Sequence, residues 1–164
     1  MSMTFQSSGQ TPVRPEPVWK SILECSAIEV FNLMATVQLT PAPSALGEPS
    51  GDRTAMVGMA GALCGMTNIR CSGETAAKLA TKMLGTDVSS SPSDVSDALG
   101  ELCNMVAGNF KSKISNLADH CMLSVPTVIS GDDYMLEPAK PVENFTVAFE
   151  YEGATIWVSL TVHG

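Results

Sequence analysis

Three polar residues stand at helical spacing in the middle of the chain: Asp97, Glu101 and Asn104. Wound at about 100° per residue, they share one face of a helix with Gly100 and Gly108. An amide both accepts and donates hydrogen bonds, so it can hold a water molecule in place, while neighbouring carboxylates act electrostatically. An ordinary solvated face carries Lys, Glu, Gln and Arg instead. Because glycine costs about 0.5–1 kcal/mol against alanine inside a helix, two glycines indicate that something approaches the backbone closely.

Two interpretations of this face stay open on the residues alone. It is either an exposed helix face whose glycines are accidental, or a docking edge that presents Glu101 and Asn104 to the active site of another protein. The histidines offer no competing chemistry, because His120 and His163 have no partner at metal-ligand spacing. The two carboxylates of the polar face also lack the further ligands that a metal ion requires. We therefore expect no metal site in this chain.

The sequence signatures of nucleophilic and phosphate-binding catalysts are missing. There is no Gly-x-Ser-x-Gly elbow and no Gly-x-x-x-x-Gly-Lys loop. Cys103 precedes Asn104 but lies toward the apolar side of the helix, which predicts a packed thiol rather than a nucleophile. The five cysteines, an odd number without a Cys-x-x-Cys pair, predict reduced and mostly buried thiols in a cytoplasmic protein.

Composition and charge limit the classes of protein to which the chain can belong. With 164 residues, 45% of them hydrophobic and 16% charged, we expect one domain over 17–164, preceded by a flexible polar tail over 1–16. The net charge of −8 argues against a nucleic-acid or anionic-membrane partner, since both bind preferentially to clusters of Lys and Arg. The N-terminus lacks the pattern of a signal peptide, and no apolar stretch approaches the ~18 residues of a membrane span.

Hydrophobic periodicity predicts the elements that position the polar face. Three helices are expected, over 17–38, 73–84 and 94–117, the second capped by Ser72. Residues 39–53, which contain several prolines and glycines, are expected to form a short strand and then a loop. Further strands are expected in two hairpins and around Pro126: residues 54–71, 121–125, 127–130, 145–151 and 154–162. A long helix, a proline-bearing strand and a hairpin thus occur twice, which indicates a loose internal duplication. Helices on one face of a mainly antiparallel sheet make an α+β sandwich the expected fold.

The polar face resembles the signature of the CheC/CheX/FliY family of bacterial chemotaxis phosphatases. In that pattern an Asp or Ser is followed by Glu, Asn and, farther along, Pro, and Asp97, Glu101 and Asn104 match its first three positions. Pro126 follows Asn104 after 21 intervening residues, one fewer than is usual in the family. The stretches 97–109 and 123–131 look most like CheX-type members, and the resemblance extends over about residues 17–162.

This resemblance implies a fold, a reaction and a set of roles. The fold is an α/β sandwich with internal pseudo-twofold symmetry, and CheX-type proteins are homodimers joined through sheet edges. The reaction is hydrolysis of the aspartyl phosphate of a CheY-like response regulator, with Mg²⁺ held by the receiver and no cofactor on this chain. Asn104 would orient the attacking water, Glu101 would pair with a receiver lysine, and Asp97 would support docking. Gly100 and Gly108 would let the receiver's loops approach the helix.

A second Glu-x-x-Asn pair, Glu29 and Asn32, lies in the first predicted helix. CheC-type members carry two such sites, but Cys25 stands here where the pattern has Asp or Ser, and no proline follows at the expected distance. The pair is therefore either a second active site or a structural remnant, and we favour the remnant. For the whole chain, the alternatives to a phosphatase are a non-catalytic receiver-binding adaptor and a scaffold dimer.

Overall fold

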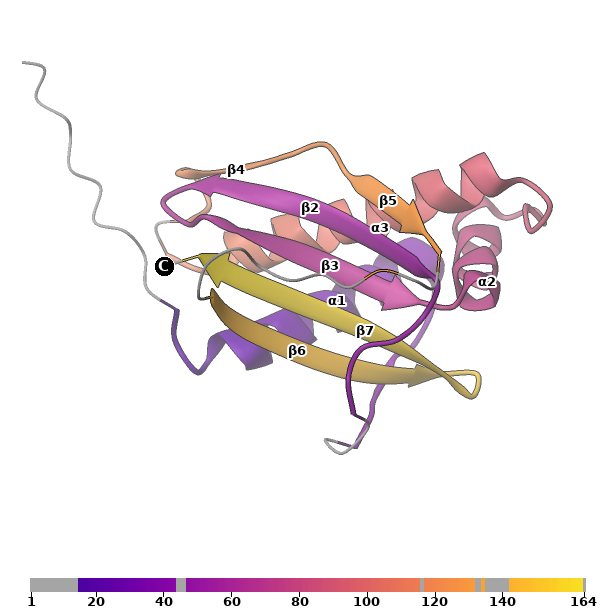
Figure 1. Ribbon diagram of the computed structural model, residues 1–164, viewed down its shortest axis with the longest axis horizontal. Coiled ribbons are helices and arrows are strands. Elements are labelled where there is room, and N and C mark those ends of the chain that lie inside the picture. Colours follow the sequence, from indigo (N-terminus) through magenta and orange to yellow (C-terminus); the bar gives the residue numbers. More distant parts are fainter. Residues whose placement is uncertain (1–14, 44–46, 116, 132–133, 135–141, 164) are drawn as a thin grey trace, which may run out of the picture.

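The computed structural model describes residues 15–43, 47–115, 117–131, 134 and 142–163. Three helices cover one face of a seven-stranded sheet (Figure 1). In chain order the elements are α1 (Trp19–Ala35), β1 (Thr40–Pro41), β2 (Arg53–Gly61), β3 (Gly65–Cys71), α2 (Gly73–Leu84), α3 (Pro92–Ser112), β4 (Cys121–Leu123), β5 (Thr127–Ser130), β6 (Val142–Tyr151) and β7 (Ala154–His163). The predicted α+β sandwich, with long helices on an antiparallel sheet, is confirmed.

In the sheet, each half of the chain pairs its short strands with the hairpin of the other half. Its strand order is β1-β6-β7-β3-β2-β4, and β5 also pairs with β2, with every pair antiparallel. The β3–β7 pair forms the centre. The short strand of the first half, β1, pairs with the hairpin of the second half, and the short strands of the second half, β4 and β5, pair with the hairpin of the first half. This arrangement agrees with the repeated order of elements predicted from the sequence.

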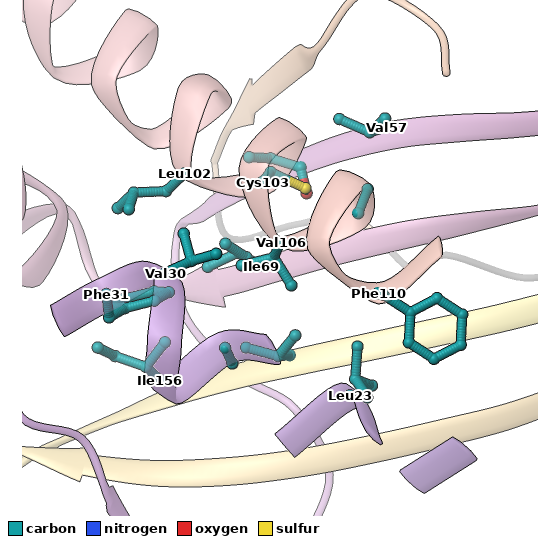
Figure 2. Packing of buried hydrophobic residues seen from close by; sticks show 14 of the residues in the cluster. Leu23, Val30, Phe31, Val57, Ile69, Leu102, Cys103, Val106, Phe110 and Ile156 are labelled. Carbon is teal, nitrogen blue, oxygen red and sulfur yellow. The ribbon is translucent and has the colours of Figure 1, made fainter. Parts of the chain in front are cut away.

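Helix α3 is held against the sheet by its apolar side, which fixes the direction of its opposite side. Leu102, Val106 and Phe110 are fully buried in the core that α3 shares with α1 and the sheet (Figure 2). The ring of Trp19 on α1 meets Phe110 edge to face, with centroids 5.7 Å apart. The Cys103 thiol donates to the carbonyl oxygen of Thr67 at 3.3 Å. Rotation of α3 about its axis would break these contacts, so the polar face has a fixed orientation.

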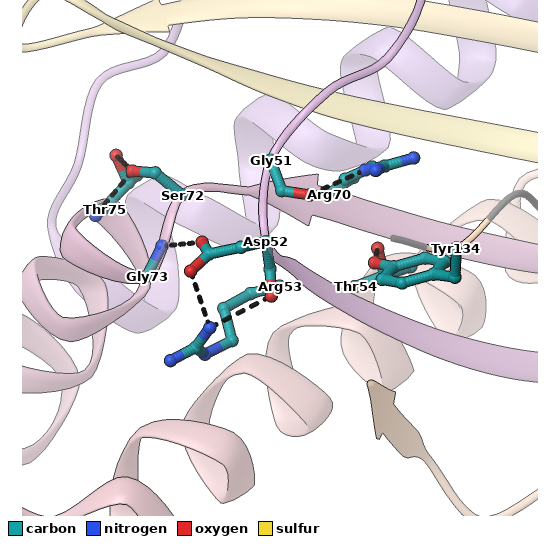
Figure 3. Close-up of polar contacts among 9 residues, drawn as sticks. All are labelled: Gly51, Asp52, Arg53, Thr54, Arg70, Ser72, Gly73, Thr75 and Tyr134. Atoms are coloured by element: carbon teal, nitrogen blue, oxygen red, sulfur yellow. Dashed lines mark hydrogen bonds and ion pairs between the residues drawn. The ribbon is translucent and has the colours of Figure 1, made fainter. Parts of the chain in front are cut away.

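Helix α2 is tied to the start of β2 by capping groups (Figure 3). Ser72 is its N-cap, as predicted, and its hydroxyl accepts a hydrogen bond from the backbone N–H of Thr75 at 3.1 Å. Asp52, which directly precedes β2, accepts from the backbone N–H of Gly73 at 2.6 Å and forms an ion pair with Arg53 at 2.9 Å. The carboxylate therefore lies where the positive end of the helix dipole stabilises it.

Two helices differ from their predicted bounds. The first ends at Ala35 rather than residue 38, because Thr36 adopts a left-handed conformation with φ of 53° and turns the chain toward β1. The third begins at Pro92, whose fixed φ suits the first helical position. It ends at Ser112 rather than residue 117. Lys111 binds the chain as it folds back there, donating from its Nζ to the carbonyl oxygen of Cys121 at 2.7 Å.

Several other expectations meet the structure only in part. The predicted tail over 1–16 lies outside the described residues except for Pro15 and Glu16, and the division into a tail and one domain stays a prediction. Three of the five cysteines are buried and two, Cys25 and Cys64, are exposed, with all five unlinked. Among the helices that the structure describes, none is long and apolar enough to cross a bilayer.

Candidate functional site

The structure brings Asp97, Glu101 and Asn104 together on the outward side of α3. Asp97 and Glu101 are exposed and Asn104 is half-buried. Neither carboxylate takes part in an ion pair with a described residue, and the amide of Asn104 makes no hydrogen bond to one. The three side chains, hereafter the polar ridge, are therefore available to bind an external molecule.

Gly100 departs from the prediction. It is buried rather than exposed, because Pro126 and the strand that follows lie directly over it. A Cβ atom built on Gly100 would lie 3.1 Å from Cβ of Pro126 and 3.6 Å from a methyl carbon of Val128. The expectation that Gly100 gives clearance to an incoming receiver loop is therefore wrong. The clearance serves the connection between β4 and β5 of the same chain.

Gly108 has a different environment. It is half-buried, and a Cβ built there would lie 3.9 Å from Cδ1 of Leu123, which is ordinary van der Waals contact. Sterics therefore do not require a glycine at this position. Gly100, Asn104 and Gly108 lie one turn apart along α3. Gly100 faces Pro126, and Gly108 faces Leu123. The residues between Leu123 and Pro126 therefore run alongside the turn of α3 that carries Asn104.

Those intervening residues form a β-bulge, which the glycine at position 58 of a predicted strand indicates only as one possibility beside tight packing against a helix. Met59 pairs with Leu123 and Met56 pairs with Thr127, so the two residues at 57–58 of β2 face the three residues at 124–126. Ser124 secures the bulge: its backbone N–H donates to the carbonyl oxygen of Gly58 at 2.9 Å, and its hydroxyl accepts from the Gly58 N–H at 2.8 Å. The bulge explains why Pro126 meets the helix. Gly58 and Pro126 are its only signals in the sequence.

The second Glu-x-x-Asn pair is occupied within the chain. Glu29 forms an ion pair with Lys113 at 2.9 Å and accepts a weaker hydrogen bond from Asn109 at 3.4 Å. The Lys113 ammonium holds the pKa of Glu29 below its usual value. Asn32 is exposed. Asn109 and Lys113 lie about two and three turns beyond Glu101 on α3, so the structure does not bring the two pairs together. This geometry supports a structural role for Glu29.

The remaining chemically capable groups do not add to the site. Burial raises the pKa of the Cys103 thiol to about 12, so the thiol stays protonated at neutral pH and cannot act as a nucleophile. In the part of the chain that the structure describes, no three His, Cys, Asp or Glu residues cluster closely enough to hold a metal ion. The expectation that this chain binds no metal or cofactor of its own stays a prediction.

The region of the chain that carries the polar ridge matches a known protein family. A family model described as "Chemotaxis phosphatase CheX" matches residues 53–150, from β2 into β6. The chain belongs to the CheX family. The matched region contains the whole polar ridge and the bulge that packs on it. The curated protein CheY-P phosphatase CheX of Thermotoga maritima is 32% identical over 83 residues, which are 50% of this chain and 54% of that protein, so the match spans about half of the relative's length.

Solved structures of CheX-type proteins share the fold. Chemotaxis protein CheX from Vibrio vulnificus superposes with a TM-score of 0.76 at 21% identity, covering 92% of this chain and 100% of that one. CheX in the CheX–CheY–BeF₃–Mg²⁺ complex from Borrelia burgdorferi gives a TM-score of 0.76 at 23% identity, covering 89% and 98%. FliY of Thermotoga maritima is more distant, with a TM-score of 0.60 at 16% identity over 90% and 91%. The resemblance to CheX-type members is thereby confirmed.

Proposed function

We propose that this chain is a protein phosphatase that hydrolyses the aspartyl phosphate of a CheY-like receiver domain and so terminates a chemotaxis signal. The observation that carries the proposal is the polar ridge, in which Glu101 and the amide of Asn104 are unengaged by described residues on the outward side of α3. Its setting in a CheX-family chain supports this choice. So do the name of the Thermotoga maritima relative, CheY-P phosphatase, and the presence of CheY in the Borrelia burgdorferi complex.

The chemistry needs positioning more than covalent catalysis. An acyl phosphate is reactive, so hydrolysis requires a water held in line with the phosphorus and compensation of the charge around it. The carbonyl oxygen of Asn104 accepts a hydrogen bond from that water, and its NH₂ group donates to an oxygen of the phosphoryl group or of the water. The water oxygen bonds to phosphorus as the bond from phosphorus to the aspartyl oxygen breaks. The aspartyl carboxylate of the receiver is regenerated, inorganic phosphate is released, and one proton passes to solvent.

The carboxylates of the ridge serve docking. Glu101 pairs with the lysine that lines the receiver's phosphorylation site, and Asp97, one turn earlier on the same face, adds to the negative potential that steers the receiver. The receiver supplies Mg²⁺, which neutralises the phosphoryl oxygens, so this chain needs no metal ligands of its own. We place the protein in the cytoplasm, where response regulators act.

The decisive experiment uses a panel of phosphorylated receivers from the same organism and measures loss of the aspartyl phosphate. The parent protein should exceed autodephosphorylation, and Asn104→Ala should remove most of that excess, by about 10²-fold or more. Asn32→Ala is the matched control, since it removes an exposed asparagine from the second pair and should leave the rate unchanged. Hydrolysis no faster than autodephosphorylation with every receiver would refute the proposal.

Two further measurements separate the proposed roles. Glu101→Ala should raise the KM for the phosphorylated receiver, and added salt should reproduce part of that loss in the parent protein. A parent protein that binds receivers without accelerating hydrolysis would instead be the non-catalytic adaptor. A dimer that binds no receiver would be the scaffold.

We also propose a homodimer formed through sheet edges. Strand β6 supports it, because β1 covers only Phe149 and Glu150 of this strand. Apart from the hydrogen bond from Ala42 to Ala148, the outer edge of β6 over residues 142–148 is not paired with any residue that the structure describes. An edge strand of this length is a ready template for pairing with another chain.

A further inference from the structure

An exposed apolar side chain lies beside the polar ridge. Val125, the middle residue of the β4–β5 bulge, is 84% exposed. Its successor Pro126 lies against Gly100, one turn of α3 from Asn104, a rise of about 6 Å along the helix axis. Burial of a valine side chain is favourable by about 1.5–3 kcal/mol, so a partner that covers Val125 gains free energy from this contact.

The bulge holds Val125 between two fixed neighbours. On one side, Ser124 is bound to Gly58 through both its backbone N–H and its hydroxyl. On the other side, Pro126 has a restricted φ and packs on α3 at Gly100. Little conformational entropy is therefore lost when a partner covers Val125, and such preorganisation favours binding.

Resting on the proposed function, we propose that Val125 is a docking contact for the receiver, packing against an apolar side chain at the rim of the receiver's phosphorylation site. A specific protein complex buries about 800 Å² on each partner, a patch with a radius of roughly 16 Å. A receiver whose phosphoryl group reaches Asn104 must therefore also cover the bulge. The receiver then contacts two neighbouring parts of the surface: the polar ridge on α3 and the apolar side chain of Val125 at the sheet edge.

The neighbouring charges favour a receiver over a lipid surface as the occupant. Asp97 and Glu101 lie on the outward side of α3, next to the bulge that carries Val125, and the whole chain carries a net charge of −8. An anionic membrane would therefore be repelled. The two contacts also differ in kind. Attraction through Glu101 weakens as salt rises, whereas apolar burial at Val125 does not.

The chain offers a matched control three residues away. Met122 is 78% exposed and pairs with Ala60 on β2. Leu123, the next residue, pairs with Met59 and packs toward the core, so alternation along the strand directs Met122 to the sheet face opposite the helices. Met122 is thus comparable to Val125 in exposure and apolar character, but its side chain lies on the sheet face opposite the helices, away from the polar ridge on α3.

The test compares Val125→Asp and Met122→Asp with the parent protein, using a phosphorylated receiver for rates and a beryllofluoride-loaded receiver for binding. Val125→Asp should raise KM and Kd about tenfold, the scale of a lost apolar contact, while kcat at saturating receiver stays within about twofold. Met122→Asp should leave all three unchanged. Val125→Ala, which keeps the bulge residue uncharged, should give a smaller rise of the same kind that persists in 0.5 M salt.

The outcomes separate this inference from the function on which it rests. If the parent protein hydrolyses the phosphorylated receiver but Val125→Asp leaves KM and Kd unchanged, the docking contact is refuted and the phosphatase stands. If the parent binds the beryllofluoride-loaded receiver without hydrolysis, and Val125→Asp weakens that binding, the contact stands and the phosphatase is refuted. Equal loss of binding in Val125→Asp and Met122→Asp would also refute the contact, because the effect would then not depend on the face of the sheet.

Discussion

Gly100 and Gly108 occupy equivalent positions along α3, two turns apart, but they face different neighbours. Replacing Gly108 with alanine adds a methyl group at 3.9 Å from Leu123 and improves helix propensity, so we expect about 0.5–1 kcal/mol of stabilisation. In Gly100→Ala the same methyl group would lie 3.1 Å from Pro126, which the bulge holds in place. We expect this clash to cancel or reverse the gain in propensity. Urea unfolding of both variants measures the difference, and equal stabilisation would contradict it.

The five thiols differ in reactivity according to their surroundings. Burial raises the pKa of both Cys71 and Cys103 to about 12, and Cys121 is also buried with a raised pKa. Cys25 and Cys64 are exposed. We therefore expect two thiols to react rapidly with a chromogenic disulfide reagent at pH 8, and three more only after denaturant is added. Rapid reaction of a third thiol in the native protein would show that the core opens locally.

The sequence predicts a side chain's direction better than it predicts what covers it. Helical periodicity placed Asp97, Glu101 and Asn104 on one face correctly, because that arrangement depends only on residues within a few turns. The burial of Gly100 depends on Pro126, 26 positions later, and the engagement of Glu29 depends on Lys113, 84 positions later. A helical wheel contains no information about such neighbours.

At the scale of elements, the ion pair of Glu29 and Lys113 links α1 to the C-terminal end of α3. Because the pair holds the pKa of Glu29 below its unfolded value, its stabilisation is present above that unfolded value, about 4.3, and is lost as pH falls through the folded value. Glu29→Gln should therefore lower the urea midpoint at pH 7, and the difference should shrink toward zero near pH 3. Glu150→Gln, an exposed carboxyl on β6 without an ion pair to described residues, should show no such dependence.

The presence of the two strands around the bulge could be predicted from the sequence, but their pairing with β2 could not. Two short strands meeting at Pro126 follow from the local pattern of apolar residues and proline, and both are present as β4 and β5. Their register against β2 is set by which residues pair across the sheet, and the extra residue at 124–126 appears only there. Val125 reads as another strand residue in the sequence, although the bulge turns it outward.

At the scale of the whole molecule, the element order allowed the α+β sandwich and its duplication to be predicted, since short connections limit the topologies that a chain can adopt. The exchange of short strands between the halves was not predicted, and it leaves the two sheet edges unequal. Strands β4 and β5 cover much of β2 at one edge, whereas at the other edge the two residues of β1 cover little of β6. The β6 edge is consequently where we expect a second copy of the chain to bind.

A proline in the β6 edge tests that assembly. Ala148 accepts a hydrogen bond from Ala42 on the side away from β7, so by alternation the backbone N–H of Asn144 also points to the outer edge. Asn144→Pro removes this donor while keeping the pairing with β7, and edge positions tolerate proline. In sedimentation velocity the variant should shift from dimer toward monomer, whereas Asn144→Ala should stay dimeric. A dimer unaffected by the proline, with Val125→Asp dissociating it instead, would place the interface at the bulge and leave the receiver no access to Asn104.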